Sequence, residues 1–490
     1  MDRHVSFMDG HTGGFSINGS HLMQQHGAPI VTARGIWGGT QSRLTVTDEG
    51  TFVTYTHRHD NENLVIDGVD GIAMHGRVAF LFKPASTQTW HLLYEWPDSV
   101  GSPVLASDKY GNVYVVSHMT QDGSHVPGSA ESRATYRPWV GKYTAGTWTG
   151  SGDTTPIRHF VWDDMTETLS NSYTAIGFSQ DGRIVLGTSG NAHTQSAPTQ
   201  CGAIDLLVFC TVKSEWVDAA RLYTQQRFSY KYINFDGDGN IEVVGHRNGH
   251  ALEAGYPSPG GNDWVFDGFY YWKLDKNFFD GLQNNYPRTK IGGEQLTVVH
   301  PSLLRYARII CSTPVSLADA NDYICLPRPS ISNAGAGDTF WDCNGDIHML
   351  YAKTYKGNDF NSALWHTVIR DGQILFGGPV MDTPGGVHSI FIKDASGSYY
   401  IFAIIGGTPS AKAQALLYKA ANTADTGWAW EQVGVFLLPA PIASGAISQA
   451  FNAGMSGHGN KIQIMYAVRD PSTAAGSNAN CWASMWIDLH

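Results

Sequence analysis

The stretch "FDGDGNIEVVGH", residues 235–246, places a glycine turn between two segments that read as strands. Asp-Gly turns flanked by alternating apolar residues are a strong β-hairpin signal. The same layout returns in "DEGTFVTYTH" (48–57) and "DKYGNVYVVSH" (108–118). In all three stretches a histidine follows the turn glycine by seven residues. A phase that recurs in this way indicates an internal repeat.

The repeat extends along the whole chain. Its turn glycines are Gly50, Gly111, Gly182, Gly239, Gly345, Gly397 and Gly459. Each lies between strand-like segments, and the intervals between them leave room for four strands apiece. The longest interval, from Gly239 to Gly345, predicts a large insertion around residues 275–330. Seven four-stranded units arranged radially protect their sheet edges. The sequence therefore predicts an all-β, seven-bladed β-propeller that forms a single domain over residues 1–490.

Three local features refine this prediction. The C-terminal "CWASMWIDLH" (481–490) reads as one more strand, which we expect to close the ring by pairing with N-terminal sequence. Short helices are expected near 215–225 and 412–422, although helical periodicity is not sustained. Among six cysteines, Cys201 with Cys210 and Cys311 with Cys325 are candidate disulfide pairs, and other pairings stay open.

Composition limits the classes of partner. Charged residues make up 15% of the chain, against about 25% in an average domain. The net charge of −11 argues against a general nucleic-acid or anionic-membrane binder. No apolar run is long enough to span a membrane as a helix. The low fraction of charged residues and the six cysteines favour a secreted, extracellular protein, although no signal peptide is present. We expect a monomer.

The repeat phase also predicts a site. In a propeller, the position seven residues after each turn glycine should lie near the axis on one face. The phase places His57, His118 and His246 there, and the hairpins start on the same face at positions that include Tyr173, Tyr230 and His388. Arg247 follows His246, and Arg133, Arg137 and His193 are expected in loops on that side. Structural roles for these histidines, and plain packing for the tyrosines, remain the alternatives.

The residue types at these positions narrow the chemistry. No serine nucleophile elbow, P-loop or dinucleotide motif is present, and no paired carboxylates share the phase. His, Tyr and Arg together suit β-elimination from a uronic acid. A cation neutralises the carboxylate, a base removes the proton from C5, and an acid protonates the oxygen that leaves C4. This scheme requires no cofactor.

Two stretches carry a family resemblance. "GNVYVVSH" (111–118), with His118, and "YKYINFDGDGNIEVVGHR" (230–247) resemble β-propeller polysaccharide lyases that cut rhamnose–glucuronate linkages. These are the fungal L-rhamnose-α-1,4-D-glucuronate lyases of gum arabic and, more distantly, the ulvan lyases. The resemblance implies release of L-rhamnose from the glucuronate of an acidic polysaccharide or oligosaccharide.

We accordingly predict a role for each candidate. His118 is the base, and Tyr230 or Tyr173 is the acid. Arg247 would pair with the carboxylate, and His57 and His246 would support the reaction. The residues expected to bind substrate alongside Arg247 are Arg133, Arg137, His193 and His388.

Several alternatives remain open. A related propeller α-L-rhamnosidase would release the same sugar by hydrolysis, and a non-catalytic carbohydrate-binding propeller would only bind it. A sialidase lacks support, because convincing Ser-x-Asp-x-Gly-x-Thr-Trp boxes are missing. The "DGDG" turn (236–239) is better explained as a hairpin turn than as a calcium loop. The resemblance nevertheless leaves room for a structural Ca²⁺ near the channel.

Overall fold

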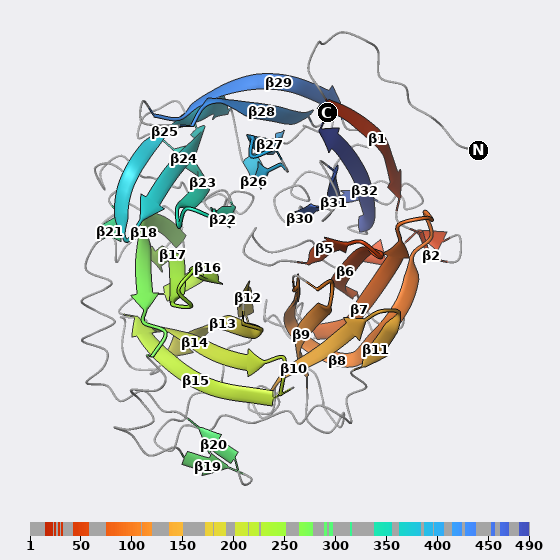
Figure 1. Cartoon of the computed structure of the whole chain (residues 1–490), viewed down its shortest axis with the longest axis vertical. Helices are drawn as coiled ribbons and strands as arrows, with labels where there is room; N and C mark the ends of the chain where they lie inside the picture. Colours follow the sequence, from red (N-terminus) through yellow and green to blue (C-terminus); the bar gives the residue numbers. More distant parts are fainter. Residues whose placement is uncertain are drawn as a thin grey trace.

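The computed structural model shows an all-β protein whose sheets are arranged in a ring (Figure 1). The structure describes residues 15–32, 43–57, 75–119, 137–149, 172–192, 201–250, 264–277, 289–296, 314–315, 338–354, 362–405, 414–437, 452–455, 461–469 and 480–489, with gaps of one to three residues inside some of these ranges. In these ranges, no helix is long and apolar enough to cross a membrane.

Antiparallel sheets make up the ring, and in its four-stranded sheets the strand that comes first in the sequence is innermost (Figure 1). The largest contains β5 (Leu44–Thr47), β6 (Gly50–His57), β7 (His75–Pro84), β8 (His91–Ser107), β9 (Val113–Met119), β10 (Arg137–Thr144) and β11 (Thr147–Thr149). Two four-stranded sheets follow: β12 (Ser172–Phe178), β13 (Arg183–Ala192), β14 (Cys201–Cys210) and β15 (Glu215–Thr224), then β16 (Arg227–Phe235), β17 (Ile241–His250), β18 (Trp264–Leu274) and β21 (Pro314–Val315).

The second half of the ring repeats this pattern. It contains β22 (Thr339–Trp341), β23 (Ile347–Thr354), β24 (Ser362–Arg370) and β25 (Gln373–Thr383), then β26 (Val387–Lys393), β27 (Tyr399–Ile405), β28 (Gln414–Asn422) and β29 (Ala429–Leu437). The last sheet joins β30 (Asn452–Met455), β31 (Lys461–Arg469) and β32 (Asn480–Leu489) to β1 (Phe15–Leu22) and β4 (Val31–Thr32). Small hairpins are formed by β2 (Gln24–Gln25) with β3 (Ala28–Pro29) and by β19 (Thr289–Ile291) with β20 (Glu294–Leu296).

The ring closes where β1, the first described strand, pairs with β32, the last. β1 pairs antiparallel with β32, with Phe15 opposite Leu489 and Ile17 opposite Ile487. This confirms the expectation that the C-terminal strand pairs with N-terminal sequence. The radial arrangement confirms the predicted β-propeller. The count of seven blades stays a prediction, since it requires dividing the seven-stranded sheet at β8, where the register shifts between Val100 and Val104.

One turn is repeated in five of the inner hairpins. In the copy that begins at Asp108, the aspartate Oδ1 accepts N–H groups from Tyr110 and Asn112, each at 2.9 Å. Gly111 then adopts a φ of 81°, in the left-handed region that glycine tolerates best. Asp236, Asp342 and Asp394 cap the corresponding N–H groups of their turns, and the Ser179 hydroxyl replaces the carboxylate in the fifth copy. Asp and Ser favour such turns because their side chains accept these backbone N–H groups.

The inner hairpin turns lie on one face of the ring, which we call the turn face. The evidence is that residues beside one turn contact residues beside the next. These contacts are Thr45–Ser107, Tyr143–Glu49, Tyr114–Phe178, Arg183–Phe235, Trp341–Glu242, Tyr399–Asp342 and Thr51–Gln463. Because each hairpin runs away from its turn, the other ends of the inner strands lie at the opposite face.

The core lies between adjacent sheets. The segment "YYIFAII" of β27 is apolar along its length because neighbouring sheets cover both of its faces. Ile401 and Ala403 pack with Leu350 and Leu364 of the preceding sheet. At the ring closure, Met465 packs against Leu44 and Val53. Burial of these side chains contributes about 1.5–3 kcal/mol for each large aliphatic group.

Two predictions about local structure were wrong. The helices expected near 215–225 and 412–422 are strands in the described residues, because Glu215–Thr224 is β15 and Gln414–Asn422 is β28. Both pair with neighbouring strands, so tertiary pairing overrides the helical preference of their Ala and Leu residues.

The Cys201–Cys210 disulfide was also wrong. The two residues begin and end one strand, β14, which separates them by about 30 Å at 3.3 Å per residue. Cys210 is a free thiol. Cys311 and Cys325 lie outside the described residues, as does turn glycine Gly459. Within the predicted insertion, the described strands are the β19–β20 hairpin and β21, which supplies the fourth strand of its sheet. A single domain with one insertion stays a prediction.

Candidate functional site

Most of the predicted site residues lie in inner strands of the ring. His57 ends β6, His118 lies in β9, and His246 and Arg247 lie in β17. Tyr173, Tyr230, His388 and Arg137 lie in β12, β16, β26 and β10, in that order. Arg133 and His193 lie outside the described residues.

The strand register places two of the predicted residues opposite each other on neighbouring strands. Tyr230 and His246 are Cα partners in the β16–β17 ladder. Directly opposed residues in an antiparallel pair have Cβ atoms about 4.5–5.5 Å apart. His388 is opposite Ile404, and His118 is opposite Val100 and Pro138.

The predicted residues belong to the face opposite the turns. His246 lies five residues beyond Ile241, the first residue of β17 after its turn, which corresponds to about 17 Å along the strand. His57 and His118 are displaced from their turns in the same direction. Convergence of these side chains on one cavity stays a prediction.

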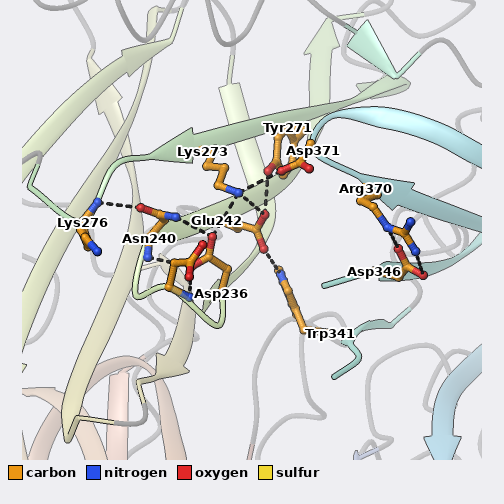
Figure 2. A network of polar contacts seen from close by, with 11 residues as sticks. Asp236, Asn240, Glu242, Tyr271, Lys273, Lys276, Trp341, Asp346, Arg370 and Asp371 are labelled. Carbon is orange, nitrogen blue, oxygen red and sulfur yellow. Dashed lines mark hydrogen bonds and ion pairs between the residues drawn. The ribbon is translucent and has the colours of Figure 1, made fainter. Parts of the chain in front are cut away.

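The turn face carries a network of polar groups around the buried Glu242 carboxylate, shown in Figure 2. At its centre the Glu242 carboxylate accepts hydrogen bonds from Tyr271 Oη at 2.6 Å and Trp341 Nε1 at 2.9 Å. Lys273 Nζ lies 4.0 Å from the same carboxylate and contacts Asp236 at 3.1 Å and Asp371 at 2.9 Å. Trp341 comes from the next sheet, so the network joins two adjacent sheets.

Burial and hydrogen bonds together shift the pKa values of the groups in this network. Burial raises the pKa of Glu242, although Tyr271, Lys273 and Trp341 oppose the shift. It also raises the pKa of Tyr271, an effect that the hydrogen bond to Glu242 reinforces. Burial would lower the pKa of Lys273, but hydrogen bonds to Asp371 and Asp236 outweigh it and raise the pKa. Lys273 therefore keeps its positive charge near neutral pH, and Tyr271 keeps its proton and donates it to the hydrogen bond with Glu242.

A second buried cluster lies between the β22–β25 and β26–β29 sheets. His348 Nδ1 and His366 Nε2 are 3.1 Å apart, and both side chains are fully buried. Their rings stack at 5.4 Å between centroids, with Phe391 and Trp428 against them. Burial, with a smaller effect from His348, lowers the pKa of His366 well below the usual value. His366 therefore stays neutral near pH 7 and serves as a buried structural group.

A carboxyl group that the sequence pattern did not predict lies close to the innermost strands. Asp338 immediately precedes β22, and its Oδ2 accepts the N–H of Phe391 in β26 at 2.9 Å. Asp338 lies outside the repeat phase that singled out the histidines and tyrosines. A lone aspartate before a strand gave no signal.

Metal binding finds no support in the described ranges. They contain no group of three or more His, Cys, Asp or Glu side chains able to hold an ion. In the "DGDG" turn, Asp236 Oδ1 accepts backbone N–H groups, and Oδ2 contacts Asn240 Nδ2 and Lys273 Nζ. A structural Ca²⁺ elsewhere stays a prediction.

No protein-family model matches this chain, and no curated protein sequence matches it. Similar solved structures include the polysaccharide lyase Uly1, at 13% identity and a TM-score of 0.47, covering 100% of this chain and 95% of that chain. They also include the α-L-arabinofuranosidase Arb93A of Fusarium graminearum, at 12% identity and 0.39, covering 94% and 96%. The NanB sialidase of Streptococcus pneumoniae matches at 10% identity and 0.39, covering 94% and 71%. At these values the similarity assigns no activity.

Proposed function

We propose that the protein is a secreted, monomeric carbohydrate-active enzyme, a polysaccharide lyase that releases L-rhamnose from glucuronate in an acidic glycan. The observation that supports this best is the Tyr230–His246 register pair in the inner strands, toward the face away from the turns. His118 occupies the same end of β9, so the strands that carry a candidate base and a candidate acid end on one face.

The reaction follows from the residue types. Arg247 pairs with the uronate carboxylate, which makes the C5 proton more acidic. Neutral His118 removes that proton, a C4–C5 double bond forms, and the C4–O4 bond breaks. Tyr230 or Tyr173 donates a proton to the departing oxygen, which leaves on rhamnose. Each proton then exchanges with water, and no cofactor is needed.

The test is turnover of gum arabic and of ulvan by the purified protein. We expect an unsaturated uronate, detected by its ultraviolet absorbance, together with free rhamnose from gum arabic. His118→Ala should reduce the rate at least 100-fold, in line with loss of a general base. His91→Ala is the matched control, because His91 is exposed at the start of β8, beside Phe82 of β7.

Other outcomes point to other functions. Rhamnose released without the unsaturated product would indicate the α-L-rhamnosidase alternative. Binding of acidic glycans without turnover would indicate a carbohydrate-binding propeller. Full activity in His118→Ala would remove this histidine from the mechanism.

A further inference from the structure

Asp338 links the innermost strands of two adjacent sheets, which Figure 1 places close to the centre of the ring. Its backbone oxygen accepts the N–H of Leu350 in β23 at 2.8 Å, which fixes it at the start of β22. Its carboxylate Oδ2 reaches the neighbouring sheet and accepts the N–H of Phe391 at 2.9 Å. The carboxyl group therefore lies in the wall formed by β22 and β26.

The surroundings of Asp338 are polar but incompletely paired. Asp338 itself is partly exposed. Ser389, on β26 two residues before Phe391, is 5% exposed, and its buried Oγ has no hydrogen-bond partner among the described residues. The same holds for the buried Oγ1 of Thr339, the residue after Asp338. Buried hydroxyls usually have partners, so two unpaired ones in the strands around the Asp338 carboxyl point to a place where a polar ligand group binds.

Burial raises the pKa of Asp338 to about 7, and the N–H groups of Phe391 and Thr339 oppose this shift. The nearest titratable groups on the elements packed around it are His348 on β23, Asp342 after β22, and His388 and Lys393 on β26. None of these is among the causes of the shift. Asp338 is therefore an acid that is half protonated near neutral pH.

We propose that Asp338 is a further catalytic residue, which donates the proton to the oxygen leaving C4 in place of Tyr230 or Tyr173. This inference rests on the proposed function. As the base takes the C5 proton and the C4–O4 bond breaks, the Asp338 carboxyl O–H transfers its proton to O4. Asp338 is left as a carboxylate, which takes up a proton from water before the next turnover.

The chemistry favours Asp338 over a phenol as the donor. A general acid works best when its pKa lies near the working pH, whereas a tyrosine ordinarily titrates near 10. The position also fits, because His388 lies three residues before Phe391, or about 10 Å along β26. A sugar bound at His388 therefore needs to extend about that far toward the turn face to reach the carboxyl.

The experiment is a pH–rate profile of Asp338→Asn on gum arabic. Asparagine keeps a carbonyl oxygen for the Phe391 N–H but carries no titrating proton. We expect kcat to fall about 100-fold, KM to change less than about threefold, and the loss of activity above pH 7 to disappear. Asp394→Asn is the matched control, because Asp394 also accepts a backbone N–H, at 2.8 Å, but lies in a turn. It should keep both rate and profile.

A second measurement needs no substrate. The denaturant midpoint of Asp338→Asn relative to wild type should rise as the pH increases from 5 to 8. The reason is that the folded wild type holds the Asp338 proton up to about pH 7, whereas the unfolded chain releases it near pH 4. A flat difference would show that the carboxyl does not titrate near neutrality and would overturn the inference.

The two proposals fail differently. If wild type turns over gum arabic and Asp338→Asn still loses activity above pH 7, the lyase proposal stands and the proposed role of Asp338 is wrong. If wild type has no turnover, the proposed function fails and the catalytic role with it. The midpoint difference then reports only the titration of the carboxyl.

Discussion

Replacing Glu242 with leucine should destabilise the fold strongly, because the carboxylate is the shared acceptor for two donors from different strands. Tyr271 Oη and Trp341 Nε1 donate to it at 2.6 and 2.9 Å, and Glu242 is 2% exposed. Glu242→Leu leaves both donors without an acceptor. Each buried unpaired donor costs about 1–3 kcal/mol, so the free energy of unfolding should fall by roughly 2–6 kcal/mol.

A competing effect reduces this figure. Removing a buried carboxylate also removes its desolvation cost, and a leucine gains apolar contacts. Lys273 is little affected, because it retains Asp236 at 3.1 Å and Asp371 at 2.9 Å. The two unpaired donors should still dominate, and we expect a net loss of about 2–4 kcal/mol.

Tyrosine variants provide a matched pair. Tyr271→Phe removes one hydrogen bond to buried Glu242, which should cost about 1.5–3 kcal/mol because the acceptor is charged. Tyr143→Phe removes the Tyr143–Glu49 bond of 3.0 Å, whose acceptor is exposed and can bind water instead. That variant should lose about 0.5–1 kcal/mol.

The assay is guanidinium unfolding followed by far-UV circular dichroism, with midpoints compared at constant slope. Circular dichroism is preferred because Trp341 would contribute to a fluorescence signal. The reasoning is refuted if Glu242→Leu unfolds within 0.5 kcal/mol of wild type, or if the two tyrosine variants lose the same stability. A double-mutant cycle between Glu242→Leu and Trp341→Phe should show coupling of about 0.5–3 kcal/mol.

Two further predictions concern contacts between adjacent sheets. Gly177→Ala should lower the free energy of unfolding by about 2–4 kcal/mol, since an added Cβ would lie 2.5 Å from the Ile233 carbonyl oxygen. Gly237→Ala has open space around its Cβ and should unfold within about 0.5 kcal/mol of wild type, and equal denaturation midpoints for the two variants would contradict this. Below pH 6.5, acid should destabilise the wild type more than His366→Phe, because His366 stays neutral in the folded protein and gains a proton on unfolding. Urea unfolding midpoints of both proteins between pH 4.5 and 7.5 test this. Midpoints that change in parallel with pH would contradict it.

The propeller could be predicted because its signal is repeated. The aspartate or serine three residues before each turn glycine caps N–H groups in five turns, and the glycine supplies the left-handed φ. One such turn would indicate only a hairpin. Spaced copies indicate a radial array, because each unit needs a neighbour to cover its apolar faces.

Other features depend on contacts that local sequence does not contain. The segment "EWVDAARLYT" of β15 looks helical by composition, and only its pairing with β14 makes it a strand. Cys201 and Cys210 are close in sequence, yet the extended strand between them separates them. Asp338 is notable only because Phe391, 53 residues away, offers it an N–H group. These contacts join residues that the ring brings together, so only the three-dimensional structure reveals them.

The two faces of the ring are built differently, and this difference bears on where a substrate can bind. Near the turns, β12 and β16 approach so closely that a Cβ on Gly177 would overlap the backbone of Ile233. Asn234 Oδ1 also accepts the N–H of Phe178 there at 3.4 Å. Tyr173 and Tyr230 lie three or four residues farther from the turns on these same strands. Since backbone fills the space between β12 and β16 at their turn end, a sugar that contacts these two strands has room only toward their other end. Activity should therefore respond to changes at that end, and stability to changes at the turns.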